Sequence, residues 1–215
     1  MKFERDSSGK VARICAISVI IICLIVLIGW IANLPFLKNM IPEANSMKVS
    51  SAFLIIISSL NLYITSYKLN KSKKIRYKNL SLLLSLLVIT TIMVLIFLTL
   101  FGEYPVSEQE FNALDLSILS PLERVSLFGV PSIATILSLI LFNSAISLKI
   151  NSYKNSRYFF NLVILVIIIS VFTILNHLFN FFVAVPYAPF WETGMAIKTA
   201  FCFFLLSLGA ISIRD

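Results

Sequence analysis

The chain has 215 residues, of which 59% are hydrophobic and only 13% are charged, and its mean hydropathy is +0.95. Soluble domains carry about 25% charged residues, so this composition excludes an ordinary water-soluble domain and indicates that lipid surrounds most side chains. The net charge is +8, but the basic residues lie in short segments between apolar runs without any recognition fold, which argues against nucleic-acid binding.

Six apolar runs predict an all-α integral membrane protein with six transmembrane helices. The runs cover residues 14–34, 49–66, 80–101, 128–148, 159–183 and 195–212, and about 20 apolar residues are enough to cross a bilayer. The chain then divides into an N-terminal segment (1–13), a membrane domain (14–212) and a C-terminus (213–215). We expect the first run to be retained as a span, because it is longer than the apolar part of a signal peptide, about 7–15 residues, and ends without a small-residue cleavage pattern.

The basic residues predict the orientation of the spans. Fourteen of the 18 Lys and Arg residues fall in the segments on one side, whereas seven of the ten acidic residues fall on the other side. Positive charge beside span ends marks the cytoplasmic side of a membrane. We therefore expect a multi-pass protein of the bacterial cytoplasmic (inner) membrane with both termini in the cytoplasm.

A short pattern occurs three times and predicts an internal repeat. Each copy has a Met or Val followed, four and five positions later, by two small residues: Met47 with Ser51-Ala52, Val130 with Ala134-Thr135, and Met195 with Thr199-Ala200. Each copy opens an apolar run and follows a proline-containing loop that another apolar run precedes. This order predicts three parallel-related hairpin repeats, in which Met47, Ser51, Ala52, Ala134, Thr135, Met195, Thr199 and Ala200 serve close helix packing.

Several polar and aromatic residues near the outer ends of spans are candidates for ligand binding. Asn176 and Asn180 lie one turn apart on the fifth span with His177 beside them, and intramembrane polar groups often mark functional sites. Trp30, Trp191 and Glu192 complete the candidate set. The alternative readings are hydrogen bonding between helices for the Asn and His residues, an interfacial aromatic belt for the Trp residues, and a solvated loop position for Glu192.

The sequence carries no catalytic motif. It lacks the patterns of serine hydrolases, zinc proteases and phosphate-binding loops, so we do not expect an enzyme. Cys15, Cys23 and Cys202 fall within spans without metal-ligand spacing, and a single His cannot supply a bis-His haem, so neither a metal nor a cofactor is expected. The absence of acidic residues deep within the spans weakens a proton-coupled transporter.

Part of this pattern resembles a known family. Gly29-Trp30, Pro42, Met47-Lys48, Ser51-Ala52, Met195, Thr199-Ala200 and Leu205–Gly209 resemble the N-terminal six-helix membrane sensor region of bacterial PAS-containing histidine kinases and diguanylate cyclases. The resemblance implies a non-catalytic sensory input module, with a cytoplasmic signalling protein or a second copy of the chain as partner in addition to membrane lipid. The middle copy departs from the family pattern, with Val130 in place of Met.

The family also has a cytoplasmic signalling domain where this sequence ends, shortly after Arg214. We expect either an output that is a separate protein or a shortened relative that has lost its output domain. Two other functions remain open. Parallel repeats also build some transporters, which suggests a small-solute transporter or channel, and a haem- or quinone-binding membrane protein is the third possibility.

Overall fold

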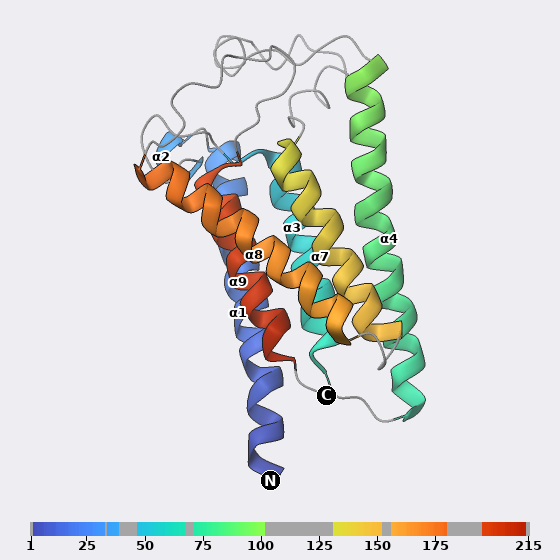
Figure 1. Cartoon of the computed structure of the whole chain (residues 1–215). Coiled ribbons are helices and arrows are strands. Elements are labelled where there is room, and N and C mark those ends of the chain that lie inside the picture. The colour runs from blue at the N-terminus through green and yellow to red at the C-terminus, as the bar shows by residue number, and fades with distance from the viewer. Residues whose placement is uncertain are drawn as a thin grey trace.

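The computed structural model describes residues 2–32, 34–38, 47–67, 71–101, 131–151, 156–179 and 195–213, and the regular structure in these segments is helical. The helices are α1 (Lys2–Ile31), α2 (Pro35–Lys38), α3 (Val49–Thr65), α4 (Lys71–Phe101), α7 (Ile133–Asn151), α8 (Ser156–Phe179) and α9 (Ile197–Ser212). Figure 1 shows the long helices in one bundle, with the start of α1 and the end of α9 at the same end.

Four helices of the bundle are long and apolar enough to cross a membrane: Gly9–Ile31, Tyr77–Phe97, Ile133–Ile150 and Arg157–Leu178. The chain is therefore an all-α protein with the character of a multi-pass membrane protein. α3 and α9 are also apolar but have only 17 and 16 residues. At 1.5 Å per residue they extend about 25 Å, compared with about 30 Å for the hydrocarbon core of a bilayer.

The helices form an inner and an outer set. α3, α7 and α9 contact one another in the centre, while α1 packs against α3 and α9, α4 against α3 and α7, and α8 against α7 and α9. In the described segments, α1, α4 and α8 make no contact with one another. Each outer helix therefore lies against two inner helices and exposes its other side.

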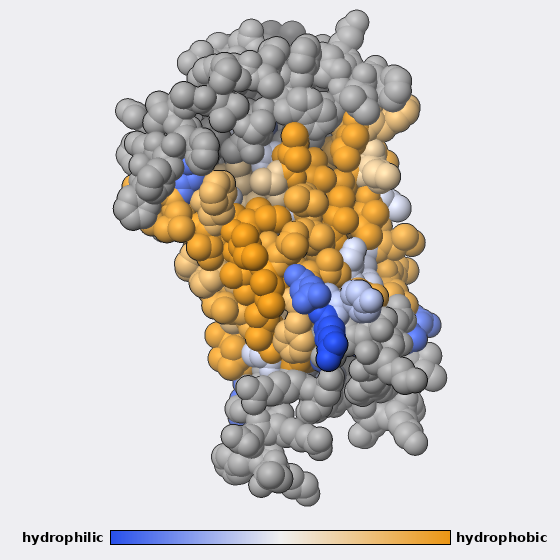
Figure 2. Space-filling view, viewed as in Figure 1, coloured by the Kyte–Doolittle hydropathy of each residue, from blue (hydrophilic) through white to orange (hydrophobic). Residues whose placement is uncertain are grey.

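Small side chains contribute to the close packing of two of the inner helices. α3 and α9 bury small residues, among them Ser51, Ala52, Thr199, Ala200 and Gly209, and small residues let membrane helices approach closely. The outer helices are rich in Leu, Ile and Val, whose exposed side chains suit contact with lipid tails. Figure 2 shows the resulting hydrophobic surface on the face that includes α8. In the spanning segment of α7, 44% of the residues are buried, compared with 22% in those of α4 and α8.

Three helices meet closely at one end of the bundle. A Cβ atom added to Gly209 would lie 3.0 Å from Cys15 Cβ, 3.0 Å from Leu62 Cδ2 and 3.4 Å from Ala12 Cα. The ends of α3 and α9 are thus packed directly on α1 in its third and fourth turns, and a side chain at Gly209 would require these neighbours to shift. We call this contact of α1, α3 and α9 the Gly209 junction.

A stacked pair supports the same end. The Arg13 guanidinium carbon lies 4.9 Å from the centroid of the Tyr67 ring, and the hydroxyl groups of Tyr63 and Tyr67 are 2.9 Å apart. The hydrogen bond with Tyr63, together with one from Arg13, lowers the pKa of the Tyr67 hydroxyl below its ordinary value. The contact between Arg13 and Tyr67 thus connects α1 with the second residue after α3.

Two thiols provide a test of how the helices are arranged. Cys23 on α1 and Cys202 on α9 are fully buried, and their thiols are neighbours in the contact between these two helices. Mercuric ion bridges neighbouring thiols because sulfur ligands are soft. We expect the purified protein to retain one mercuric ion per chain after a wash with a competing monothiol, measured by intact-protein mass.

The Cys15→Ser variant should retain this ion, because both bridging thiols remain. The Cys23→Ser variant is the matched control, since it keeps two thiols on the same helices, Cys15 and Cys202, in different places. Retention of the ion by Cys23→Ser would contradict the contact between α1 and α9 at these residues.

Candidate functional site

A cluster of polar side chains is buried where α3, α4 and α7 meet. Its members are Ser58 and Asn61 on α3, Ser81 and Ser85 on α4, and Asn143 on α7, and each is 3% exposed or less. We call these five residues the amide cluster. They lie far apart in the sequence and come together only when α3, α4 and α7 pack against one another.

Asn61 connects α3 to both neighbouring helices. Its Nδ2 donates a hydrogen bond to Ser85 Oγ at 2.8 Å and a longer one to Asn143 Oδ1 at 3.4 Å. Its Oδ1 accepts a hydrogen bond from Ser81 Oγ. Both polar atoms of the Asn61 amide are therefore paired with other helices.

Asn143 completes the cluster from α7. Its Nδ2 donates to Ser58 Oγ at 2.8 Å and to Leu139 O of its own helix at 3.0 Å. Ser58 Oγ in turn donates to Leu54 O at 2.9 Å. Each side-chain nitrogen and oxygen of the two asparagines thus has a partner, as burial away from water requires.

The chemistry of the amide cluster is limited to hydrogen bonding. Carboxamides and hydroxyls do not change protonation state near neutral pH, so the cluster holds no group suited to act as a general acid or base. In lipid, hydrogen bonds between helices contribute about 0.6 kcal/mol on average and up to about 1.7 kcal/mol each. The cluster therefore stabilises and orients α3, α4 and α7. A solute between these helices would meet only hydrogen-bond donors and acceptors in it.

Two ring nitrogens bond to backbone carbonyls at the opposite end of the bundle from the Gly209 junction. Trp30 Nε1 donates to Met47 O at 2.8 Å, and His177 Nε2 lies 2.8 Å from Met195 O. Because a carbonyl oxygen only accepts, His177 Nε2 carries the hydrogen in this bond. We call these two interactions the ring-to-carbonyl bonds.

The two carbonyl groups that accept these bonds occupy equivalent backbone positions. Met47 and Met195 are both 1% exposed, and each stands two residues before the first residue of a helix, α3 or α9. The residues between them and the helices, Lys48 and Ala196, have φ and ψ of −68° and 148°, and −60° and 144°. The starts of α3 and α9 are therefore fixed in the same way.

A lysine connects α9 with the short helix α2. Lys198, in the first turn of α9, donates from Nζ to Leu37 O of α2 at 2.6 Å. A hydrogen bond from a charged donor is among the stronger kinds. It connects the start of α9 with the short helix that follows α1.

The structure describes some of the candidate residues predicted from the sequence. Trp30 and His177 form the ring-to-carbonyl bonds, and Asn176 Oδ1 is buried without a hydrogen-bond partner in the described residues. Among the residues of the repeat pattern, Ala134 is half-buried and Met47, Ser51, Ala52, Thr135, Met195, Thr199 and Ala200 are buried. Asn180, Trp191 and Glu192 lie outside the described residues.

Sequence reasoning did not select the amide cluster. Asn61 and Asn143 were visible as polar residues in apolar runs, and Ser58 stands three residues before Asn61, so a polar face on α3 could have been recognised. Ser85 and Asn143, the partners of Asn61, lie 24 and 82 residues from it along the chain, and no local sequence pattern reveals such distant contacts. In the described segments, no group of three or more His, Cys, Asp or Glu residues could hold a metal ion.

Replacing Asn61 should destabilise the bundle. The Asn61→Leu variant leaves the Asn143 carbonyl oxygen and the two α4 hydroxyls without their amide partner, and we expect the free energy of unfolding to fall by about 1–3 kcal/mol. Unfolding in mixtures of mild detergent and dodecyl sulfate measures the change. Ser170→Ala is the matched control, because Ser170 is equally buried but donates only to Val166 O of its own helix, and its effect should be much smaller.

The Asn61→Leu, Asn143→Leu double variant should lose less stability than the sum of the two single variants. Replacement of both partners by apolar side chains leaves fewer unpaired groups than replacement of one. Strictly additive effects would show that the two amides do not act as a unit.

Comparisons with protein-family models, with curated proteins and with solved structures find no match to this chain. The function proposed below is therefore supported by the sequence and by the geometry of the described residues.

Proposed function

We propose that the chain is a six-span membrane protein built from three helix hairpins, α1–α3, α4–α7 and α8–α9. The support is a cyclic pattern of contacts. The first helix of each hairpin packs on its own partner and on the second helix of another hairpin: α1 on α9, α4 on α3, and α8 on α7. The pattern returns to its start after three steps, as an axis of approximate threefold symmetry along the membrane normal would require.

The helix starts support the same repeat with a correction to its register. Ala52 N bonds to Lys48 O, Ile136 N to Ser132 O and Ala200 N to Ala196 O, at 3.0, 2.9 and 3.0 Å. Counted from these first turns, Thr135 corresponds to Ser51 and Thr199, and all three are 3% exposed or less. The middle copy is thus shifted by one residue relative to the sequence pattern, which pairs Ala134 with Ser51.

The function best supported is that of a non-catalytic sensory input module in a bacterial cytoplasmic membrane, with both termini in the cytoplasm. The observation that carries it is the connection between the two ends of the bundle. The ring-to-carbonyl bonds fix the starts of α3 and α9 at the outer end, and the same two helices end in the Gly209 junction at the inner end. A stimulus that alters the contacts at the start of α9 therefore acts on a helix whose other end lies against α1, and these two helices carry the ends of the chain that we place in the cytoplasm.

The amide cluster favours a second candidate function, a small-solute transporter or channel. Parallel repeats around an axis normal to the membrane occur in transporters, and the cluster provides hydrogen-bonding groups within the bundle. Its amides are already bonded to one another, however, so a solute would have to replace those bonds. A haem-binding role has less support, because the His177 Nε2 that would bind iron is engaged with Met195 O.

Photo-cross-linking in native membranes tests the sensory proposal. A photoreactive residue in place of Lys10, which is exposed near the inner end of α1, should capture a cytoplasmic kinase or cyclase that mass spectrometry identifies. The matched control carries the same residue in place of Phe36, which is 86% exposed on α2 at the other end, and should not capture that partner.

Recovery of no signalling partner at the inner position would count against a sensory module. Uptake of labelled amino acids, sugars or ions by proteoliposomes, reduced by Asn61→Leu, would instead support the transporter.

A further inference from the structure

Two polar residues are exposed on α8, close to its start. Arg157 and Asn161 stand four residues apart, which places them on one face of the helix, and both are exposed. The same side continues with Ile164, Leu165 and Ile168, which are 46%, 46% and 59% exposed. Figure 2 shows hydrophilic residues at the lower end of α8, next to the hydrophobic surface that continues along the helix.

The exposure of Asn161 requires a partner for its amide. A carboxamide has two hydrogens to donate and an oxygen that accepts, and hydrocarbon provides no group to bond with them. Asn161 lies five residues after the start of α8, about 8 Å along the helix axis. A residue at this distance from the cytoplasmic end lies near the level where lipid glycerol and ester groups meet the acyl chains.

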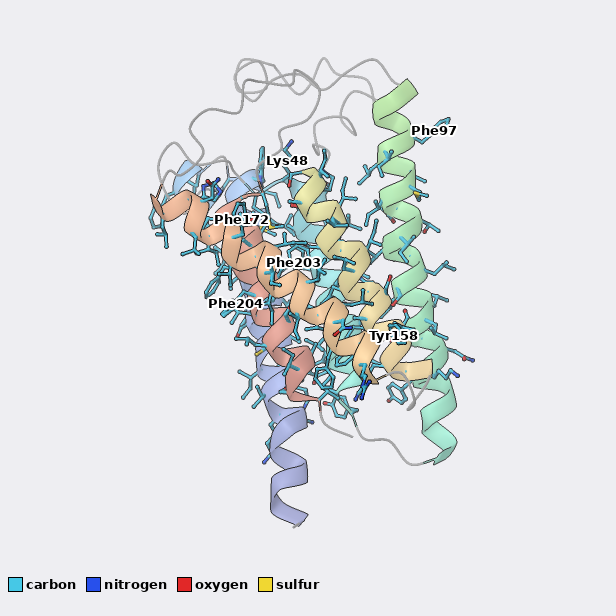
Figure 3. The ribbon with its side chains drawn as sticks, viewed as in Figure 1. Lys48, Phe97, Tyr158, Phe172, Phe203 and Phe204 are labelled. Carbon is cyan, nitrogen blue, oxygen red and sulfur yellow. The ribbon has the colours of Figure 1, made fainter. Side chains whose placement is uncertain are left out.

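Further residues at the same end suit a lipid headgroup. Tyr158 is 65% exposed at the start of α8, where interfacial tyrosines commonly lie (Figure 3). At the adjoining end of α7, Lys149 Nζ lies 5.2 Å from the ring centroid of Phe159. The segment that begins α8 thus combines positive charge, an interfacial aromatic ring and an exposed amide above an apolar surface.

We propose that Arg157 and Asn161 form a binding site for one anionic phospholipid of the cytoplasmic leaflet. The planar guanidinium of Arg157 binds the phosphate through paired N–H groups, as it does other phosphates. The Asn161 amide binds an ester carbonyl of the same lipid, and an acyl chain lies along Ile164, Leu165 and Ile168. Charge complementarity and the apolar surface below the pair favour a membrane lipid over free phosphate. The site depends on the membrane location of α8 and not on the sensory function.

Native mass spectrometry of the full chain in detergent, with phosphatidylglycerol or phosphatidylcholine added, tests the proposal. Wild type should retain phosphatidylglycerol more strongly than phosphatidylcholine. The Arg157→Gln variant should bind phosphatidylglycerol about fivefold more weakly, the effect of one basic residue near an anionic lipid surface. The Asn161→Leu variant should weaken retention of both lipids, because both contain ester groups.

Lys10→Gln is the matched control, because it removes the same charge from an exposed residue on α1, and it should change retention less than twofold. Equal losses in Arg157→Gln and Lys10→Gln would overturn the proposal, since net charge alone would then explain binding. Conversion of a dimer to a monomer by Asn161→Leu, with lipid retention unchanged, would also overturn it and would assign this face of α8 to a second copy of the chain. Excess inorganic phosphate should not displace the lipid, and full displacement would indicate a site for free anions.

Discussion

Hydrogen bonding inside lipid is the constraint on which the arrangement of this bundle depends. A polar side chain between the helices has no water to bond with, so leaving it unpaired is costly, and among the described residues only the buried oxygens of Ser138, Asn176 and Ser207 have no partner. Ser59, Ser170 and Thr173 are paired within their own helices, by donating to the carbonyl four residues earlier. Because these hydrogen bonds do not involve another helix, they do not determine which helix packs beside them.

Asn61 differs because its amide has more groups than its own helix can pair. Its oxygen and nitrogen take partners from α4 and α7, and those partners exist only when the three helices meet in one register. The serines permit close packing, and the asparagines select which helices pack. Apolar packing against α1 and α8 lacks this selectivity, since lipid tails are as apolar as the Leu and Ile side chains that they replace.

The sequence predicted the features of the fold that depend on composition, namely the all-helical membrane class and the approximate positions of the apolar helices. It predicted less about the helix ends. The first span was expected to reach residue 34, whereas α1 ends at Ile31. Nor did the sequence predict how the helices begin: Ser132 caps α7 through its hydroxyl, which accepts a hydrogen bond from Thr135 N at 3.3 Å, whereas α3 and α9 start without a side-chain cap. For the candidate site, His177 and Trp30 were recognisable as unusual side chains, but their carbonyl partners were not, since backbone groups carry no sequence signature.

The close approach at Gly209 has a consequence for how the two ends of the chain move. With Gly209 against Cys15 and Ala12, the last helix lies in direct contact with the first at this level, and a movement of one toward the other is resisted by that contact. Gly9 extends the contact, because a Cβ atom there would lie 2.9 Å from Ser66 O. The N-terminal and C-terminal helices are therefore in direct contact near the two ends of the chain, so a displacement of α9 at this level acts on the N-terminal part of α1.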